Sequence, residues 1–368
     1  MFQQRVARLQ SLMKAQDLEV LALVPGASLF YLTGLSFHLM ERPTIAFVQS
    51  EGNPILMLPS LEAAKAKTSP LALELITYED EEVSRKQAYQ AAAQALDLQS
   101  GQIGMEPLSM RAFELHILHE IIPHLRLKPA ADLLTALRLY KDAQEIVHMR
   151  QAVRVAETAL KTTLASFRIG MSEEAMASEL VIQLLRAGSA SELPFQPIVA
   201  SGPNSALPHA TPTSRKIQKG DLLIIDYGAR VQGYVSDITR TFAIGEIQGD
   251  WQAVYDVVLA ANAAGRAAVR PGMTCAQIDQ ITRRVIVEGK LGEYFIHRTG
   301  HGIGLEGHED PSVQGDNGCA LEPGMTFTIE PGVYIPGRGG IRIEDNVAVT
   351  DTACEVLTTL PRELEVIG

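Results

Sequence analysis

Cysteine is scarce in this chain of 368 residues: only Cys275, Cys319 and Cys354 are present, and no two of them have a CxxC spacing. A sparse, odd-numbered set is typical of reduced thiols rather than of a disulfide framework. No run approaches the roughly 20 apolar residues that a membrane-spanning helix needs. Residues 1–16 lack the continuous apolar core of a signal peptide. We therefore expect a cytoplasmic protein with no membrane partner.

The chain also lacks an excess of basic residues. Its 32 Lys and Arg against 43 Asp and Glu give a formal net charge of −11. This charge argues against nucleic acid or an anionic lipid surface as the main partner. The 46% hydrophobic and 20% charged residues are ordinary for a globular protein. The length is sufficient for two domains.

The first part of the chain alternates helical and strand patterns. Phe2, Val6, Leu9 and Met13 recur at helical spacing. Three short apolar runs, VLALV, TIAFV and PILML, follow between turn signals and read as strands. Residues 85–96 and 110–120 again have a helical pattern. This order predicts an α/β N-terminal domain over residues 1–140 and a second domain over residues 141–368.

The second part contains two similar segments, which predict an internal duplication. Residues 168–188 and 270–290 each begin with an RxGM[ST] turn and continue as a helix that ends near glycine. Ser172 and Thr274 occupy the N-cap positions, and Gln277 completes a capping box with Thr274. The pattern favours two α+β halves that face each other. Chance similarity of two helix starts is the alternative.

Each half then supplies two acidic residues within apolar, glycine-punctuated segments. Asp226 and Asp237 belong to the first half, Glu330 and Glu344 to the second, and His301 lies between the pairs. Buried carboxylates repel each other and resist desolvation. Two divalent cations would balance four such charges, so the pattern predicts a two-metal hydrolytic site. The alternative is turn and surface acids with no common site.

Neighbouring residues extend this prediction. His297, His301 and His308 lie within twelve residues, in a spacing that differs from the HExxH of helical zinc peptidases. A structural histidine in a glycine loop is the alternative. Arg342 shares one strand face with Glu344 and could orient a metal-binding carboxylate. An exposed polar face with an ion pair is the other interpretation of these two residues.

The phrases IIDYG, SDITRT, GHGIG, IEPGVY and RIED, taken in order, resemble the pita-bread metallopeptidases. The resemblance is specific over about residues 145–368 and weaker before them. The two-domain layout is similar to the branch of Xaa-Pro dipeptidases (prolidases) and aminopeptidases P. It implies an α/β N-terminal domain of the creatinase and prolidase type, followed by a pita-bread α+β catalytic domain with an internal pseudo-twofold duplication. Creatinase has a similar layout but lacks the metal ligands that this sequence retains.

The resemblance also implies a role for each matching residue. Asp226 and Glu344 would bridge two divalent ions per subunit, either Mn, Co or Zn. Asp237 would bind one ion, and His301 and Glu330 would bind the other. The implied reaction is hydrolysis of the peptide bond before proline in Xaa-Pro dipeptides, by a hydroxide that bridges the two metals.

Catalytic roles follow from the same resemblance. His209 and His308 would contact the substrate carbonyl and the proline end, while Glu330 would carry a proton to the leaving nitrogen. His297 matches a further histidine beside the site. The alternative activity is aminopeptidase P-type removal of the N-terminal residue from longer Xaa-Pro peptides. An inactive peptide-binding relative is a third interpretation, which the full ligand set disfavours.

The sequence departs from the family at Gly307, where a β-branched residue is more usual, and at Ser312, where some prolidases have an arginine. An anchor for the substrate carboxylate is therefore missing at position 312. Related prolidases are homodimers in which an N-terminal loop reaches the partner's active site. Residues 36–43 resemble this loop, so His38 or Arg42 is predicted to cap the pocket. A solvated surface loop is the alternative.

Overall fold

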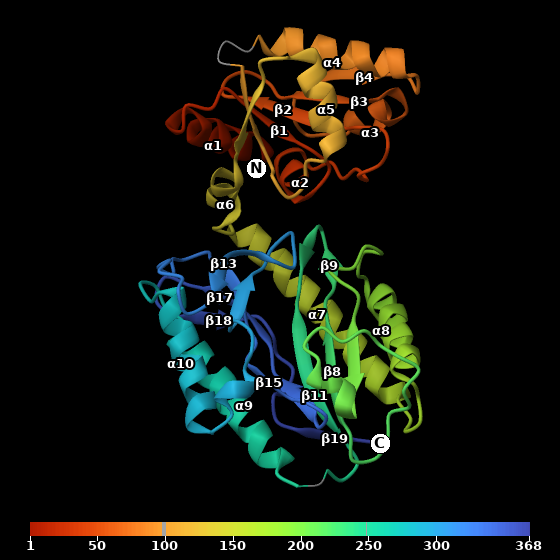
Figure 1. Cartoon of the computed structure of the whole chain (residues 1–368), viewed down its shortest axis with the longest axis vertical. Helices are drawn as coiled ribbons and strands as arrows, with labels where there is room; N and C mark the ends of the chain where they lie inside the picture. Colours follow the sequence, from red (N-terminus) through yellow and green to blue (C-terminus); the bar gives the residue numbers. More distant parts are fainter. Residues whose placement is uncertain (98–100, 248) are drawn as a thin grey trace. The chain divides into compact units, whose positions relative to one another are not determined.

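The computed structural model describes residues 1–97, 101–247 and 249–368. These residues divide into two compact units, Met1–Arg138 and Leu139–Gly368, which are drawn in Figure 1. Within the described ranges, no helix combines the length and the apolarity that crossing a membrane requires.

The N-terminal unit is built around a mixed six-stranded sheet of order β4-β3-β2-β1-β5-β6. Its strands are β1 (Val20–Leu23), β2 (Ile45–Gln49), β3 (Ile55–Pro59), β4 (Glu74–Tyr78), β5 (Gln102–Met105) and β6 (Arg126–Pro129). Its helices are α1 (Phe2–Ala15), α2 (Ala27–Thr33), α3 (Ala63–Ala66), α4 (Glu82–Leu96), α5 (Ala112–Ile121) and α6 (Ala131–Arg138), with the 3-10 turn η1 (Ser60–Glu62).

Both faces of the central strand β1 are buried, which explains its continuous apolar run. Val20 and Ala22 pack in one cluster with Tyr89 of α4 and Leu118 of α5. Leu21 points to the opposite face because side chains alternate along a strand, and it is equally inaccessible. The predicted α/β character of this unit is therefore confirmed.

The C-terminal unit contains two sheets and two small hairpins. Its strands are β7 (Ile198–Ser201), β8 (Leu222–Tyr227), β9 (Arg230–Val231), β10 (Tyr234–Val235), β11 (Ile238–Ile244), β12 (Gly300–Gly302), β13 (Glu309–Val313), β14 (Thr326–Ile329), β15 (Gly332–Ile335), β16 (Gly339–Arg342), β17 (Asp345–Val349), β18 (Cys354–Val356) and β19 (Glu365–Ile367). Its helices are α7 (Ala143–Ser166), α8 (Glu173–Ala187), α9 (Trp251–Ala268) and α10 (Cys275–Glu288), with the 3-10 turns η2 (Gly202–Ala206) and η3 (Gly292–Tyr294).

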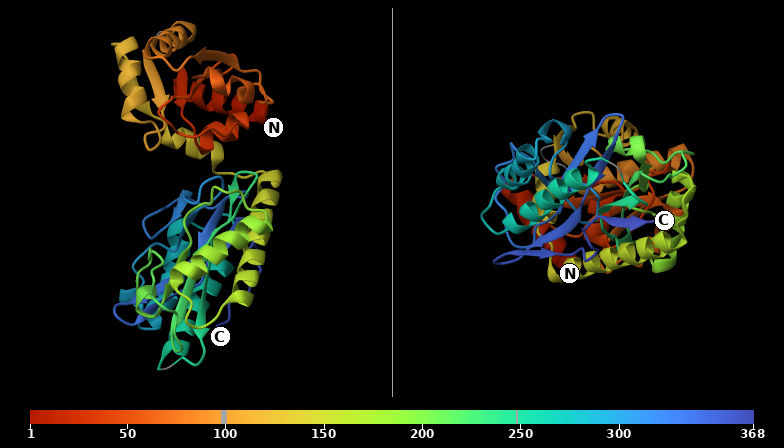
Figure 2. Two further views of the ribbon diagram at one scale, coloured as in Figure 1. Left: turned by 90° about the vertical axis from the view of Figure 1, so that its right-hand side faces the viewer. Right: turned by 90° about the horizontal axis from the view of Figure 1, so that it is seen from below.

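The sheet orders are β19-β11-β8-β7 and β13-β12-β14-β17-β18, and the hairpins are β9/β10 and β15/β16. The helices form two packed pairs, α7 with α8 and α9 with α10. Figure 1 shows one pair on each side of the strands of this unit, and the turned views of Figure 2 show α7 and α8 side by side along it.

The predicted duplication is visible in the strand pattern. In the first half, Asp226 lies near the end of β8, the hairpin β9/β10 follows, and Asp237 directly precedes β11. In the second half, Glu330 directly follows β14, the hairpin β15/β16 follows, and Glu344 directly precedes β17. Strands β8 and β11 pair antiparallel, as do β14 and β17. Each half therefore presents two acids around one hairpin.

The helix starts also agree with the sequence. The Ser172 hydroxyl accepts a hydrogen bond from the Ala175 backbone at 3.2 Å and so caps α8. Thr274 and Gln277 form a reciprocal capping box at the start of α10. These caps satisfy backbone N–H groups that have no partner within the helix, and they fix where α8 and α10 begin.

Candidate metal centre

A cavity of about 780 Å³ opens in the C-terminal unit, and the two pairs of acids and the histidine between them border it. The five side chains come from strands or strand ends of both halves. Four of them are at most 9% exposed, and Glu330 is only slightly more accessible. The alternative of separate turn and surface acids is therefore wrong. These four acids and the histidine are Asp226, Asp237, His301, Glu330 and Glu344.

Strand pairing brings the first two acids together. Strand β8 runs antiparallel to β11, so Asp226 lies opposite Thr239. Asp237 stands two residues before Thr239, at the entry to β11. Thr239 also reaches the other half, since its hydroxyl donates to Glu344 Oε2 at 2.7 Å. One strand edge thus places acids from both halves at the same cavity.

Arg342 joins the two halves by an ion pair. Its Nη2 lies 2.6 Å from Asp226 Oδ2, and both side chains are buried. Glu344 is only 1% exposed. The interpretation of Arg342 and Glu344 as an exposed polar face is therefore wrong. The guanidinium contacts one carboxylate oxygen of Asp226. The other oxygen, Oδ1, is buried and has no hydrogen-bond partner among the described residues.

The tightest part of the cluster consists of Asp237, His301 and Glu344. One potential ligand atom from each lies within 4.8 Å of the other two. His301 Nε2 is 3.6 Å from Asp237 Oδ2 and 3.3 Å from Glu330 Oε1. Three of the five predicted ligands thus form a compact group, and the imidazole also reaches the fourth.

The tautomer of His301 decides what this arrangement can bind. Its Nδ1 lies 3.0 Å from the Gly302 carbonyl, which can only accept, so the ring proton is on Nδ1. Burial lowers the pKa of His301 to about 3, so the ring is neutral at neutral pH. Its Nε2 lone pair then faces two carboxylates. A bound cation would convert this repulsive contact into shared coordination.

The acids are correspondingly perturbed. Burial raises the pKa of Asp237 and of Glu344 well above the usual carboxyl range, and repulsion from neighbouring acids adds to each shift. Burial also raises the pKa of Glu330, to about 7. Within the described residues, Asp226 Oδ1 and Glu344 Oε1 are buried without a hydrogen-bond partner. Unpartnered carboxylate oxygens beside a neutral imidazole suit divalent cations that accept oxygen and nitrogen ligands.

The remaining predicted histidines surround the cluster. His209 and His308 are both exposed, and both border the cavity. The rings of His308 and His301 have centroids 4.0 Å apart. His297 Nε2 lies 3.0 Å from the Tyr334 hydroxyl, which accepts from Arg342 Nη1 at 2.7 Å. A chain of hydrogen bonds thus connects His297 to the guanidinium that pairs with the cluster.

The family comparison agrees with this geometry. The model described as "Metallopeptidase family M24" matches residues 147–351, and the "Creatinase/Prolidase N-terminal domain" model matches residues 5–140. The chain is a member of metallopeptidase family M24. Divalent metal use follows from membership together with the buried ligand group.

Full-length relatives support the same fold. The M24 protein described here is 33% identical over 362 residues to an Xaa-Pro dipeptidase of Lactobacillus delbrueckii subsp. lactis, covering 98% of each chain. A solved dipeptidase of Pyrococcus horikoshii OT3 shares 38% identity, with a TM-score of 0.92 over 99% of this chain and 100% of that one. A solved prolidase of Thermococcus sibiricus shares 31%, with a TM-score of 0.94 over 100% and 99%. The predicted two-domain pita-bread architecture is confirmed.

Sequence reasoning missed Arg298, which also borders the M24 cavity. Its side chain has no local sequence signal, because its partner Ser312 lies 14 positions further along the chain. Backbone pairing between Thr299 and Val313 aligns the two segments, and Arg298 Nη1 donates to Ser312 Oγ at 3.2 Å. An arginine is therefore present beside the very position where the sequence lacks one.

A second missed pair supports the loop of His308. Glu309 accepts hydrogen bonds from the backbone N–H groups of Leu305 and Glu306. Its other oxygen lies 3.0 Å from Lys141 Nζ, and both side chains are buried. A residue at the start of the M24 unit thus fixes the loop that carries a predicted catalytic histidine.

The predicted caps belong to the N-terminal unit. His38 is exposed. Arg42 lies 2.6 Å from Asp80 and also contacts Glu41 at 3.1 Å. This pairing raises the pKa of Arg42. A role for His38 or Arg42 at a partner subunit's pocket stays a prediction, and Arg42 would have to exchange its partners to fulfil it.

Proposed function

We propose that this protein hydrolyses the peptide bond before proline in Xaa-Pro dipeptides, using two divalent metal ions. The observation that carries the proposal is the buried His301, whose Nε2 is directed at a buried group of acids with unpartnered oxygens. Asp226 and Glu344 would be shared between the ions, Asp237 would hold one, and His301 and Glu330 would hold the other. When bound, such ions supply a hydroxide nucleophile near neutral pH and polarise the carbonyl.

The histidines and Glu330 would act on the substrate directly. His209 and His308 border the cavity, and they would donate hydrogen bonds to the developing negative charge of the substrate carbonyl. Glu330 would take the proton of the attacking water and transfer it to the proline nitrogen. The leaving nitrogen needs this proton because cleavage of the C–N bond would otherwise expel a strongly basic amide anion.

The residues that line the pocket suit a dipeptide that ends in proline. Pro194, Phe195 and Pro208 form an apolar part of its wall, suitable for a proline ring. Arg298 provides a cation in the same cavity. We infer that its guanidinium binds the C-terminal carboxylate of a dipeptide, in place of an arginine at position 312.

A paired substrate assay tests this proposal. The metal-loaded protein should cleave Ala-Pro much faster than Ala-Pro-Ala, and chelation should abolish both reactions. Arg298→Met should raise KM for Ala-Pro about 10- to 100-fold, the usual effect of losing a charged hydrogen bond. Arg298→Lys is the control, since it keeps the charge and should retain part of the affinity. Faster loss of the tripeptide would instead establish the aminopeptidase P-type alternative.

Manganese, cobalt and zinc all suit this ligand set, and metal analysis of the purified protein distinguishes them. We further propose a cytoplasmic homodimer, by analogy with prolidases whose N-terminal loop resembles residues 36–43. Light scattering should give twice the chain mass of 40.0 kDa. Arg42→Ala should then change cleavage of dipeptides relative to tripeptides. An unchanged ratio would remove the capping role of this loop.

A further inference from the structure

Two buried asparagines contact the backbone of the predicted metal ligands without belonging to the ligand set. Asn262 lies on α9 and is inaccessible to solvent. Its Nδ2 donates to the Ile329 carbonyl at 3.1 Å and to the Ile343 carbonyl at 3.3 Å. These carbonyls belong to the peptide bonds that lead directly into Glu330 and Glu344. A single carboxamide therefore connects the two acids of the second half.

Asn346 on β17 makes the corresponding contact with the first half. Its Oδ1 accepts from the Asp237 backbone N–H at 3.0 Å, and its Nδ2 donates to the Asp237 carbonyl. Asn346 is also inaccessible to solvent. Because the side chain contacts both the N–H and the C=O of one residue, it fixes the backbone of Asp237 in position and in rotation.

The chemistry of the carboxamide suits this task. The acids lie close together and repel each other when no cation is bound, since Asp237 and Glu344 have ligand atoms within 4.8 Å of each other and Glu330 contacts the same imidazole. A carboxylate clamp would add to that repulsion, and an ammonium or guanidinium would compete with the cations. A carboxamide is neutral, and it offers both a donor and an acceptor.

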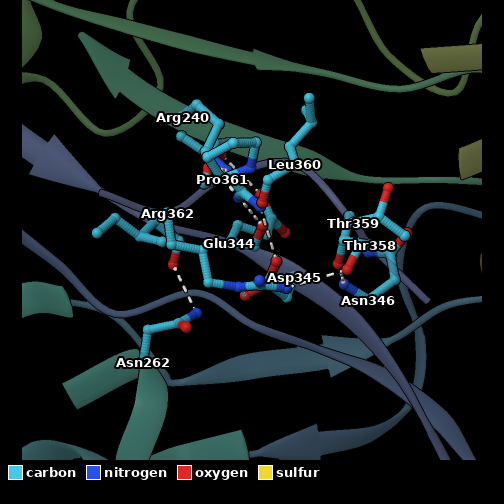
Figure 3. A network of polar contacts seen from close by, with 12 residues as sticks. Arg240, Asn262, Glu344, Asp345, Asn346, Thr358, Thr359, Leu360, Pro361 and Arg362 are labelled. Atoms are coloured by element: carbon cyan, nitrogen blue, oxygen red, sulfur yellow. Dashed lines mark hydrogen bonds and ion pairs between the residues drawn. The ribbon is translucent and has the colours of Figure 1, made fainter. Parts of the chain in front are cut away.

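Asn262, which Figure 3 draws together with the polar network of Arg240, Glu344 and Asp345, is itself held by a further contact. Its Oδ1 accepts from Arg266 Nε at 2.7 Å, and that guanidinium lies 3.3 Å from Asp345. Arg240 contacts the same carboxylate at 2.9 Å and donates to the Glu344 carbonyl at 2.7 Å. The residue after Glu344 is thereby fixed as firmly as the residue before it.

We propose that Asn262 and Asn346 are positioning residues that hold the backbones of Asp237, Glu330 and Glu344 at cation-binding separation before the cations arrive. The inference rests on the proposed metal-dependent function. It predicts that removing either carboxamide weakens metal binding more than it weakens the fold, since the ligand atoms themselves remain.

Asn262→Leu and Asn346→Leu test this directly, because leucine has the same branching and the same number of side-chain heavy atoms but no polar atom. Calorimetric titration with Mn²⁺ should show affinity reduced about 10- to 100-fold, as expected for groups that orient metal ligands. Thr282→Val is the matched control. Thr282 is fully buried on α10, beside Gly265 of α9, and its hydroxyl has no partner among the described residues. Its Mn²⁺ affinity should stay within threefold of the original.

The melting temperature without metal separates positioning from general stability. If the leucine variants melt lower but bind Mn²⁺ as tightly as the original protein, the asparagines are structural only and the inference is wrong. If the unaltered protein binds no divalent cation, the proposed function fails instead. Should Asn262→Leu not fold, Asn262→Asp keeps the acceptor for Arg266. Its affinity should also fall, although the added negative charge alone would strengthen cation binding.

Discussion

Replacing Glu330 by glutamine should stabilise the metal-free protein while weakening its metal binding. Glu330 is surrounded by other acids, and burial raises its pKa to about 7. The ionised side chain is therefore unfavourable in the folded, metal-free state. Glutamine cannot ionise, yet its Oε1 can still accept the hydrogen bond that Thr328 donates at 3.1 Å. The substitution thus removes a charge while preserving shape.

The pKa shift gives the size of the effect. Between the ordinary glutamate pKa of 4.5 and the folded-state pKa of about 7, the folded state binds more protons than the unfolded state, so stability falls as pH rises. The loss is complete above pH 7 and amounts to about 3 kcal/mol, at 1.36 kcal/mol per pKa unit. It should shrink to about 1 kcal/mol or less at pH 5. For a unit of this size, 3 kcal/mol corresponds to roughly 6–12 °C in melting temperature.

Thermal and urea unfolding with excess chelator at pH 8 and pH 5 measure this difference. Glu330→Gln should unfold later than the original protein at pH 8 and nearly together with it at pH 5. With Mn²⁺ present, the order at pH 8 should reverse, because the variant has lost an anionic ligand. Glu288→Gln, at an exposed position on α10, is the control and should shift stability by about 0.5 kcal/mol or less. A metal-free variant that is less stable at pH 8 would refute the reasoning.

Three further predictions follow from contacts in the C-terminal unit. Gly307→Val should leave the melting temperature unchanged or slightly raised. Among the described residues, no atom beyond the chain neighbours lies within 4 Å of the added Cβ, and valine reduces the conformational freedom of the unfolded chain. Because the side chain narrows the cavity, steady-state kinetics should show a raised KM for substrates with a large residue before proline. Lys141→Met should lower kcat for Ala-Pro by tenfold or more with little change in Mn²⁺ affinity, since it removes the ion pair between Lys141 and Glu309. An unchanged kcat would mean that the loop of His308 does not need this ion pair. Arg342→Met should cost about 3–5 kcal/mol in urea unfolding of the metal-free protein, because it leaves Asp226 buried and unpaired, and Mn²⁺ should restore a part of that loss.

The fold was largely predictable because its elements have strong local signals. The amphipathic spacing of α7, the apolar runs of the first sheet and the two N-caps are each encoded within a few residues. The duplication was predictable for the same reason, since Ser172 and Thr274 mark equivalent helix starts. The elements β9 and β10 have two residues each, too few for a periodic signal. The small hairpin that they form therefore has no periodic signature in the sequence.

The acids of the site were predictable because a charged residue in an apolar strand needs a compensating partner. Asp226 follows four consecutive apolar residues, and Glu330 directly follows the buried strand Thr326–Ile329. Their convergence in one cavity was expected from this charge pattern and from the family resemblance, and the structure brings them together. We propose that divalent cations balance these charges, and titration with Mn²⁺ tests whether they bind.

The supporting residues could not be read from the sequence. Asn262 and Asn346 contact backbone atoms 67, 81 and 109 positions away, so only the folded chain reveals their partners. Their surroundings in the sequence are those of an ordinary helix and an ordinary strand. Arg298 was hidden for a related reason, since its neighbour Ser312 lies on the adjacent strand. Neutral or solitary polar residues give no local sign of the group that they hold.

The difference between the acids of the site and the residues that support them has a physical basis. Raised pKa values at Asp237, Glu330 and Glu344 mean that the metal-free site opposes folding at neutral pH. For Glu330 alone the cost is about 3 kcal/mol, a sizeable part of the net stability of a typical domain, about 5–15 kcal/mol. The surrounding framework must therefore hold the acids in place against their own repulsion. Neutral carboxamides achieve this without altering the charge of the site, so the strength of metal binding should depend on residues that never touch the metal.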